Sequence, residues 1–587
     1  MCGIVSVLTF EKEIIECLIS SLERLEYRGY DSAGIAYIDE NSKIERIRRV
    51  GKVAHLRQAV EKLNTNSHIG IGHTRWATHG KAIEKNAHPH IAGGVAIVHN
   101  GIIENFEQIK RELLNEGEVF ESDSDSEVIA KLISYHIKTG LSFTEAMKTS
   151  MPRLKGTYAI AAIYEKQPNV LIGTKKGSPM AVGLSSDGRS IFIASDSVAL
   201  SSLAGQITYL EDGDFVICLK EEEITYKILD SSFSEVNRSL ILNNIAQNTV
   251  TKSGFADFML KEIFEEPNTA LETFNNFGSP IDLSQYKNIS LIACGTSYYA
   301  GVLAKYWIED LVGIHTDVEI ASEFRYRNPV LSKSTLYIFI SQSGETIDTL
   351  NALRNVKAQG LDTLSIVNVE SSSIDREAKY KIKTSAGPEI GVASTKSFIA
   401  QALSLLLLFV DKNKIDIKEI THAMNEVISQ YEKIKNVANK IKNSKSLLYI
   451  GRGTSYPIAL EGALKAKELS YISAEGYPSG EIKHGPMALV DESIYSIILA
   501  PQDKYFEKTI SNAQEILARN GRVLFITNEG VQLNFGQASY LYVPKIDPTA
   551  QPFVLTTAIH LLAYYIAKQK GLNVDQPRNL AKSVTVE

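Results

Sequence analysis

The stretch NISLIACGTSY (residues 288–298) decides the fold of the second half of the chain, because it reads as a buried strand that runs into a glycine-rich turn. SLLYIGRGTSY (residues 446–456) repeats this pattern, and Gly-Thr-Ser-Tyr begins at position 295 and again at 453. A helix-like stretch follows each copy. A repeat of such long period predicts a duplicated α/β domain. We expect each copy to be a doubly wound parallel sheet, with ligands bound at the carboxyl ends of its strands.

The first 230 residues follow a different pattern, in which short β-like runs alternate with turn signals. The runs are 34–38, 69–72, 95–98, 158–163 and 191–194, and helical stretches 106–114 and 126–136 fall between them. This pattern predicts an α+β domain of stacked, mostly antiparallel sheets. The polar, Ser- and Asn-rich segment 230–252 is the best candidate for a linker. The predicted divisions are 2–230, a linker and connecting helix at 231–270, α/β domains at 271–425 and 436–577, and a tail at 578–587.

Composition excludes several classes of protein. The 587 residues are 44% hydrophobic and 22% charged, with a net charge of −6, which suits a globular protein that binds neither nucleic acid nor membrane. The four cysteines form no C-x-x-C pair, and no signal peptide is visible, so we expect a cytoplasmic location. The most apolar run, 403–410, is far shorter than the roughly 20 residues that span a bilayer.

One turn in the second half suits an anion. The strand 336–340 runs into SQSGET (residues 341–346), which offers three hydroxyls, an amide and a glycine before a helical pattern. Backbone N–H groups at a helix N-terminus attract phosphate, although a Ser/Thr-rich helix cap is the alternative interpretation. The second repeat has Ala500-Pro501-Gln502-Asp503 here and lacks the hydroxyls. We therefore predict one phosphate site per chain.

Charged residues near the second repeat could carry proton transfer. Glu461, Lys465 and Glu468 share one helix face by spacing, although a solvated salt-bridge face is the ordinary interpretation of such a triplet. His484 lies between glycine-bounded turns and could shuttle a proton. Lys582 lies in a moderately apolar tail, where it could form a Schiff base with a carbonyl substrate.

The N-terminus holds a possible nucleophile. If Met1 is removed, Cys2 carries a thiol and a free α-amine on one residue. An amine with a pKa of about 7.7–8.0 can accept a proton near neutral pH, which is a known arrangement for attack on an amide. A cysteine at position 2 is more often an accident, so this residue decides nothing alone.

Several motifs together resemble a known family. The first domain resembles the glutaminase domain of the N-terminal-nucleophile (Ntn) amidotransferases, through CGI (2–4), HTRWATHG (73–80), NAHPH (86–90) and HNG (99–101). Residues 271–425 and 436–577 look like two sugar-isomerase (SIS) domains. Together with the KSVTVE tail (582–587), this combination resembles the isomerizing glutamine–fructose-6-phosphate aminotransferases over essentially the whole chain. The implied fold is an α+β Ntn glutaminase domain followed by two α/β SIS domains.

The resemblance implies a glutamine site in the first domain. Cys2 would attack the carboxamide with its α-amine as base, while the Asn100 side chain and the Gly101 N–H would form the oxyanion hole. The family pattern favours Asp125 over Asp123 as the acid that holds the α-ammonium. The other implied glutamine residues are Arg75 for the α-carboxylate, Trp76 as gate of an ammonia channel, and Thr78, His79 and Tyr30 in the closing apparatus.

The resemblance also implies a sugar site in the second half. Lys582 would form the imine with open-chain fructose 6-phosphate, and His484 would assist ring opening. Glu468 would move a proton between C1 and C2, supported by Lys465 and Glu461, which also count among the sugar-binding residues. The implied phosphate and sugar cradle consists of Thr296, Ser297, Ser341, Gln342, Ser343, Thr346, Val392 and Ser394.

The implied reaction joins glutamine and fructose 6-phosphate to give glucosamine 6-phosphate and glutamate, at the start of amino-sugar synthesis. It needs no metal and no organic cofactor. In this family the histidine reaches across from a neighbouring subunit, which implies a homodimer or a larger homo-oligomer. One departure lies in the connecting helix, where Asp257 replaces the family's usual histidine and domain coupling could differ.

Two other functions remain to be weighed. An amidotransferase that feeds ammonia to phosphoribosyl pyrophosphate would share the glutaminase domain, but the two SIS-like repeats argue against it. A non-catalytic sugar-phosphate sensor would bind without turnover, and the joint presence of Glu468, His484 and Lys582 argues against that.

Overall fold

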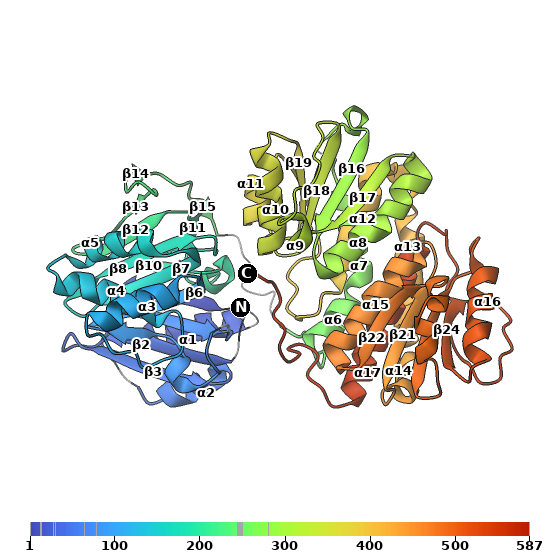
Figure 1. The fold of residues 1–587 in the computed structure, drawn as a ribbon, viewed down its shortest axis with the longest axis horizontal. Coiled ribbons are helices and arrows are strands. Elements are labelled where there is room, and N and C mark those ends of the chain that lie inside the picture. Colours follow the sequence, from blue (N-terminus) through green and yellow to red (C-terminus); the bar gives the residue numbers. More distant parts are fainter. Residues whose placement is uncertain are drawn as a thin grey trace. The chain divides into compact units, whose positions relative to one another are not determined.

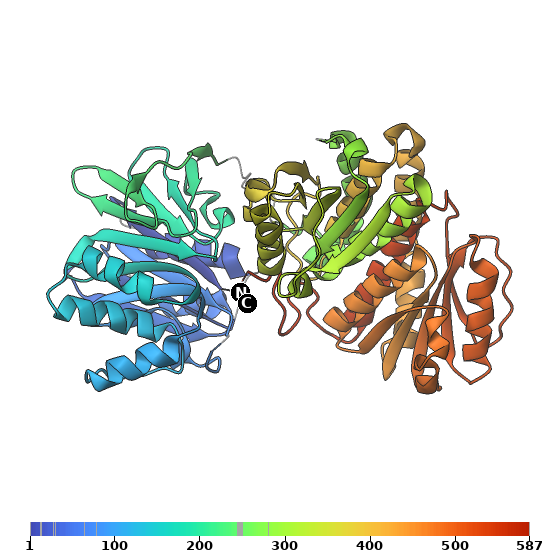
Figure 2. The same cartoon turned by 45° about the horizontal axis from the view of Figure 1, so that its top comes forward.

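The computed structural model describes residues 2–11, 14–26, 29, 31–63, 65–77, 79–243, 251–279 and 281–585. Contacts between residues divide the chain into two compact units, 1–249 with 583–587 and 250–582. In each unit, sheets are covered by helices (Figures 1 and 2). Among the described residues, no helix combines the length and apolar character needed to cross a bilayer.

The first unit contains two antiparallel sheets. The strands of the larger sheet are β1 (Gly3–Thr9), β2 (Ser32–Ile38), β3 (Ile44–Val50), β4 (Ile69–Arg75), β9 (Ala181–Leu184), β10 (Ser190–Ala194), β11 (Gln206–Tyr209) and β15 (Ile241–Leu242), in the order β15-β11-β9-β10-β1-β4-β2-β3. Those of the smaller sheet are β5 (His90–Ala92), β6 (Val95–Ile103), β7 (Gly156–Tyr164), β8 (Gln167–Lys176), β12 (Phe215–Lys220), β13 (Ile224–Leu229) and β14 (Glu235–Val236), in the order β14-β13-β12-β8-β7-β6-β5. The helices are α1 (Ile14–Leu25), α2 (Val53–Val60), α3 (Phe106–Asn115), α4 (Glu127–Lys138) and α5 (Phe143–Ser150).

The two sheets are stacked between helical layers. Successive residues of a strand face opposite sides, so β1 sends Ile4 and Leu8 into the core between the sheets and Val5 and Val7 into the core beneath α1 and α2. Helices α3, α4 and α5 cover the outer face of the smaller sheet. The α+β architecture of stacked antiparallel sheets predicted from the sequence is confirmed.

The segment 230–252 is more ordered than its polar composition suggests. Strand β14 pairs with β13, and strand β15 pairs with β11, so the segment extends one edge of each sheet. Residues 244–250 lie outside the described part of the chain.

The second unit contains two parallel five-stranded sheets of identical topology. One comprises β16 (Asn288–Ala293), β17 (His315–Ile320), β18 (Thr335–Ser341), β19 (Thr363–Val367) and β20 (Tyr380–Lys383), in the order β17-β16-β18-β19-β20. The other comprises β21 (Ser446–Gly451), β22 (Ser473–Pro478), β23 (Ile494–Ala500), β24 (Arg522–Asn528) and β25 (Ser539–Val543), in the order β22-β21-β23-β24-β25. The predicted pair of doubly wound parallel sheets is confirmed.

Helices fill the space between these two sheets and cover their outer faces. The helices are α6 (Phe258–Phe264), α7 (Glu266–Asn276), α8 (Gly295–Trp307), α9 (Ala321–Phe324), α10 (Ile347–Ala358), α11 (Ser373–Glu377), α12 (Lys396–Phe409), α13 (Ile417–Ser429), α14 (Tyr431–Ile441), α15 (Ser455–Ser470), α16 (Phe506–Leu517) and α17 (Gln551–Gln569). Helices α7, α8, α12, α13, α15 and α17 share one apolar core with both sheets. The apolar run 403–410 lies largely in α12, whose residues are almost all buried.

Candidate active sites

Strand pairing in the first unit brings Cys2 beside Trp76. Strands β1 and β4 are antiparallel with Gly3 opposite Thr74, so the residue before β1 meets the residue after β4. The Trp76 N–H donates to Cys2 Sγ at 3.2 Å, and Sγ lies 3.5 Å from the Trp76 carbonyl oxygen. Burial raises the pKa of the Cys2 thiol, which the Trp76 N–H and the Arg75 charge partly offset. A buried, protonated thiol needs an adjacent base to become a nucleophile.

The predicted oxyanion-hole residues lie on β6, next to Cys2. Asn100 Nδ2 donates to the Cys2 carbonyl at 3.0 Å, and Asn100 Oδ1 lies 3.0 Å from His73 Nε2. Burial lowers the pKa of His73 to about 3, so its ring is neutral and orients the Asn100 amide through one N–H. Gly101 has a φ of 134°, and a Cβ there would lie 2.0 Å from the Thr157 carbonyl oxygen, so only glycine fits.

His73 belongs to a cluster of four buried histidines. The His73 and His88 rings stack with centroids 4.0 Å apart, and His90 packs edge-on against His88 at 4.6 Å. His99 Nδ1 lies 2.8 Å from Ser126 Oγ. Burial is the largest cause that lowers the pKa of each of the four, so the cluster is neutral. These histidines lie within the motifs that carry the family resemblance, but no role for any of them was predicted from the sequence.

The residues predicted to bind glutamine lie near Cys2 to different extents. Arg75 and Asp125 are each 3% exposed, and both charges act on the Cys2 thiol. The Arg75 guanidinium donates to the carbonyls of His79, Gly80 (3.2 Å) and Lys81 (3.3 Å), so it holds the loop that follows β4.

The structure separates the two candidate acids of this predicted glutamine set and places one of its closing residues. Asp125 accepts the Ile103 N–H at 2.9 Å, whereas the Asp123 side chain is 58% exposed and pairs with Lys85. The His79 ring packs against Phe106. Thr78 and Tyr30 lie outside the described residues.

In the second unit, the predicted phosphate cradle lies at the switch point of the first parallel sheet. Strands β16 and β18 are neighbours whose connections leave in opposite directions, which is where α/β sheets bind ligands. Thr296 and Ser297 begin α8 after β16, and the turn 341–346 joins β18 to α10.

The hydroxyls of that turn already bind its backbone. Ser341 Oγ accepts the Gly344 N–H at 3.0 Å and lies 3.0 Å from Thr346 Oγ1, while Ser343 Oγ accepts the Glu345 N–H at 3.1 Å. Gly344 has a φ of 66°, and a Cβ there would lie 1.9 Å from Ser372 Oγ. The turn is thus shaped in advance, at the N-terminus of a 12-residue helix.

The charged face of α15 is buried, so the interpretation as a solvated salt-bridge face is wrong. The side chains of Glu461, Lys465 and Glu468 are 0%, 1% and 20% exposed. Lys465 Nζ lies 3.4 Å from Glu461 Oε1 and 2.8 Å from Glu468 Oε2. It also donates to Thr296 Oγ1 at 3.0 Å, which ties this helix of the second repeat to the start of α8 in the first.

Lys582 lies in a buried acidic niche. Its Nζ donates to a Glu389 carboxylate oxygen and to the Gly391 carbonyl (2.8 Å), and its side chain is 4% exposed. Burial raises the pKa of Glu389, but Lys582 and backbone N–H groups lower it to about 2. Glu262 in turn accepts the N–H groups of Ile390 and Gly391. Neither glutamate was predicted from the sequence as a site residue.

The loop around Gly391 carries the remaining predicted residues. Ser394 Oγ donates to Glu389 Oε2 at 2.8 Å, so Ser394 lies with the Lys582 niche. The Val392 N–H donates to the Asp575 carbonyl at 3.0 Å, and the Asp575 carboxylate accepts the first N–H groups of α6. Asp257 accepts the Tyr564 hydroxyl at 2.7 Å and pairs with Lys568 at 3.0 Å, which anchors α6 to α17.

Within the described part of the chain, the predicted catalytic residue His484 makes no side-chain contact with the other two predicted catalytic residues of the second unit. It is exposed on the loop after β22, and among the described residues no side-chain contact joins it to Glu468 or Lys582.

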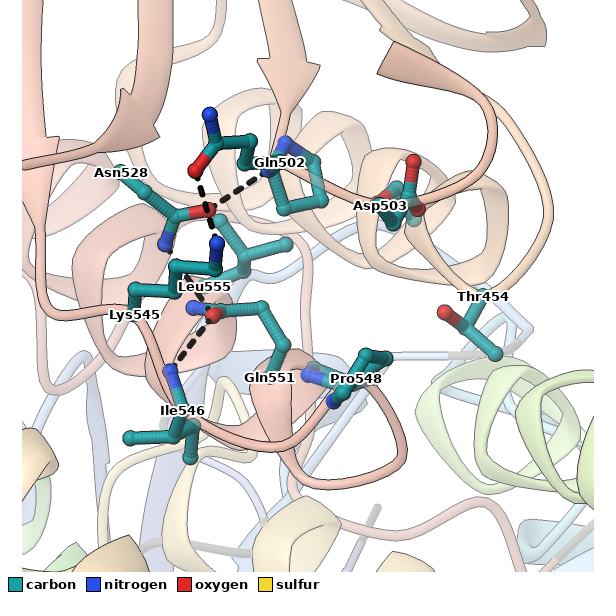
Figure 3. Close-up of a pocket in the computed structure, with 12 residues that line it drawn as sticks. Thr454, Gln502, Asp503, Asn528, Lys545, Ile546, Pro548, Gln551 and Leu555 are labelled. Atoms are coloured by element: carbon teal, nitrogen blue, oxygen red, sulfur yellow. Dashed lines mark hydrogen bonds between the residues drawn. The ribbon is translucent and has the colours of Figure 1, made fainter. Parts of the chain in front are cut away.

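A small cleft lies at the switch point of the second sheet (Figure 3). A cleft of about 10 Å³ lies between Thr454, Gln502 and Gln551, which is room for roughly one water molecule. Amide groups bind one another across it: Asn528 Oδ1 accepts the Gln502 N–H at 2.6 Å, and Asn528 Nδ2 donates to Gln551 Oε1 at 3.1 Å. Lys545 Nζ donates to Gln502 Oε1 at 2.8 Å. These contacts narrow the cleft between the ends of β21 and β23.

Comparisons with known proteins agree with this architecture. The family model "SIS domain" matches residues 282–411 and 440–564, and "Glutamine amidotransferase domain" matches 73–202. The chain is 45% identical to the glutamine–fructose-6-phosphate aminotransferase (isomerizing) of Bartonella henselae and 44% identical to that of Zymomonas mobilis, over 100% of both chains in each case. The solved C-terminal domain of glucosamine–fructose-6-phosphate aminotransferase from Francisella tularensis is 39% identical, with a TM-score of 0.52 over 56% of this chain and 100% of that domain.

Proposed function

This chain belongs to the family of isomerizing glutamine–fructose-6-phosphate aminotransferases, and from that premise we propose how its residues divide the reaction. The enzyme transfers the amide nitrogen of glutamine to fructose 6-phosphate and isomerises the sugar, which gives glucosamine 6-phosphate and glutamate. The first unit hydrolyses glutamine, and the second binds and converts the sugar.

In the first unit, Cys2 attacks the glutamine carboxamide once Met1 is removed, because only then is its α-amine free to take the thiol proton. The Asn100 amide has two N–H groups, of which one binds the Cys2 carbonyl, and the other can donate to the developing oxyanion. Arg75 and Asp125 bind the α-carboxylate and α-ammonium. His79 and Thr78 close the site, and Trp76 gates the path by which ammonia leaves.

In the second unit, the turn 341–346 binds the phosphate, with Thr296 and Ser297 beside it, since N–H groups and hydroxyls converge there at a helix N-terminus. Gln342 and Val392 line the same cradle. Lys582 forms the imine with the open-chain sugar. Imine formation requires that the ammonium lose a proton, and Glu389 is the carboxylate in contact with it.

Glu468 moves the proton between C1 and C2, because it is the member of the buried α15 triplet that keeps a partly exposed carboxylate. Lys465 Nζ lies 2.8 Å from an oxygen of that carboxylate. The observation that carries the assignment is the contact of Lys465 with both Glu468 and Thr296. This contact links the proposed proton-transfer residues to the start of α8, where we propose that the sugar phosphate binds.

The test is Lys582→Ala, assayed for glucosamine 6-phosphate formation and for glutamine hydrolysis. We expect sugar conversion to be lost while hydrolysis survives, because Cys2 and its neighbours belong to the other unit. Loss of hydrolysis with intact ammonia-dependent synthesis would contradict the assignment. Ammonia delivered to a ribose acceptor would favour the phosphoribosyl rival, and sugar binding without turnover would favour the sensor.

His484 is exposed, and we infer that it completes the sugar site of a second copy in a homodimer or larger homo-oligomer. Subunits carrying His484→Ala should therefore complement subunits carrying Lys582→Ala when the two are co-expressed, since one site of the mixed dimer is then intact. Tandem affinity tags isolate the mixed dimer. Failure of the mixed dimer to exceed either parent would show that His484 acts within its own chain or not at all.

A further inference from the structure

A continuous line of buried charged side chains runs from α7 to the carboxylate of Glu468. Glu266 Oε1 lies 2.6 Å from His560 Nδ1, and Glu461 Oε1 lies 3.3 Å from His560 Nε2. Lys465 continues the line from Glu461 to Glu468. The side chains of Glu266, His560 and Glu461 are 0% exposed, and they come from three different helices, α7, α17 and α15.

Geometry fixes the charge of the histidine in this line. Both ring nitrogens of His560 face carboxylate oxygens, and both can be satisfied only if both carry hydrogen. Burial lowers the pKa of His560, but Glu266 and Glu461 outweigh it and raise the pKa to about 9. Signs therefore alternate along the line near neutral pH, from Glu266 to Glu468.

We propose that His560 is a positioning residue for the isomerisation step, which fixes Glu461 from behind and, through Lys465, sets the charge and orientation of Glu468. The Glu266–His560 pair would then be a permanent part of the sugar site although it touches no substrate. This inference rests on the proposed role of Glu468.

The charges of the groups that face His560 determine the direction in which each substitution should move the pH profile. Helix α7 contributes Glu266, helix α15 contributes Glu461, and α12 presents the uncharged ring of Phe398 with centroids 6.3 Å apart. His560→Gln removes a positive charge behind Glu461, so the acid limb of the kcat profile should move to higher pH. Glu266→Gln removes a negative charge and should move this limb the opposite way.

The experiment measures kcat and KM for fructose 6-phosphate between pH 5.5 and 9 in the full-length enzyme with glutamine, and in parallel the glutaminase rate. The variants are His560→Gln, Glu266→Gln and the double variant, whose net charge equals that of the parent. Thr556→Val is the matched control, since Thr556 is equally buried on α17 but its hydroxyl binds only the Pro552 carbonyl within the described residues.

We expect His560→Gln to lower kcat for synthesis by at least about tenfold, with KM for fructose 6-phosphate and the glutaminase rate little changed. The double variant should return the acid limb toward the parent, because it removes one positive and one negative charge and so keeps the net charge behind Glu461. It also keeps the inference testable if a single variant fails to fold.

The inference is overturned if His560→Gln folds with the parent's kcat and pH profile. It is also overturned if all the variants, the double variant included, lose the same activity with one unshifted profile, because that is the mark of a purely structural role. Glu468→Gln separates the two hypotheses. If it keeps synthesis, the proposed function itself fails; if it abolishes synthesis while the His560 series behaves like the parent, only this inference fails.

Discussion

Acid should weaken the first unit through its buried histidines. An unfolded histidine has a pKa of about 6.5, whereas burial holds the pKa of His73 at about 3 in the folded protein. The folded pKa lies below the unfolded one, so the unfolded state binds the proton first. The stabilisation is complete above pH 6.5 and is lost progressively as the pH falls toward 3.

The magnitude follows from that difference. Between pH 7 and pH 5 the native His73 stays neutral while the unfolded residue becomes protonated, which removes about 2 kcal/mol from the free energy of unfolding. His88 and His90 have pKa values that burial lowers well below the ordinary value, so they add to this loss in the same direction.

Fluorescence can follow the first unit separately. The chain has two tryptophans, Trp76 and Trp307, and each unit holds one of them. In a Trp307→Phe background, urea unfolding followed through Trp76 should give a free energy at least about 2 kcal/mol smaller at pH 5 than at pH 7. His73→Gln should reduce this dependence, whereas the same change at the exposed His55 should leave it unaltered.

The pH dependence of the free energy of unfolding should have the opposite direction in the second unit. His560 has a folded pKa of about 9, so its contribution is complete below pH 6.5 and is lost as the pH rises through 9. The free energy of unfolding of the second unit, followed through Trp307, should therefore decrease in alkali.

The reasoning for the first unit would be refuted if its free energy of unfolding were equal at pH 5 and pH 7. It would also be refuted if the pH dependence of that free energy were unchanged in His73→Gln.

Three further predictions concern catalysis and stability. Enzyme that retains Met1, confirmed by mass analysis, should hydrolyse glutamine at least about 100-fold more slowly than processed enzyme, because the base is then part of a peptide bond; equal rates would exclude the α-amine as base. Asn100→Ala should lower glutaminase kcat about 10²–10³-fold and spare ammonia-dependent synthesis; loss of both would indicate misfolding. Glu389→Gln leaves the buried Lys582 without its counter-charge and should lower the free energy of unfolding of the second unit by about 3–5 kcal/mol in urea; an unchanged midpoint would contradict this ion pair.

Local patterns were sufficient to predict the elements that frame both sites. The apolar run 288–293 is the strand β16 residue for residue, and the hydroxyl-rich turn 341–346 joins a strand to a helix as expected. Such elements are specified within a few residues, by side-chain period and by the turn that follows. The two short strands within 230–252 have no such local signal, because they exist only as edges of sheets formed elsewhere in the chain.

The buried charge partners could not be predicted in this way. Glu389 is one acid among many in the sequence, and its partner Lys582 lies 193 residues away. His560 stands in an apolar helix, where a histidine reads as a packed core residue until Glu266 and Glu461 are seen on either side. The usable signal was weak: an ionisable residue inside an otherwise apolar helix needs partners, because burial without them is costly.

The duplicated domains differ in a way that agrees with our proposal of one sugar site per chain. Both sheets have the same strand order, but the second switch point is filled by the amides of Asn528 and Gln551. The second repeat instead contributes α15, whose buried Lys465 reaches Thr296 at the switch point of the first repeat. Since the helices of both repeats share one apolar core, a residue of one copy can act at the turn of the other. We infer that the first copy was kept for binding and that the second supplies the acid–base residues, a division that requires the two copies to remain packed as one unit.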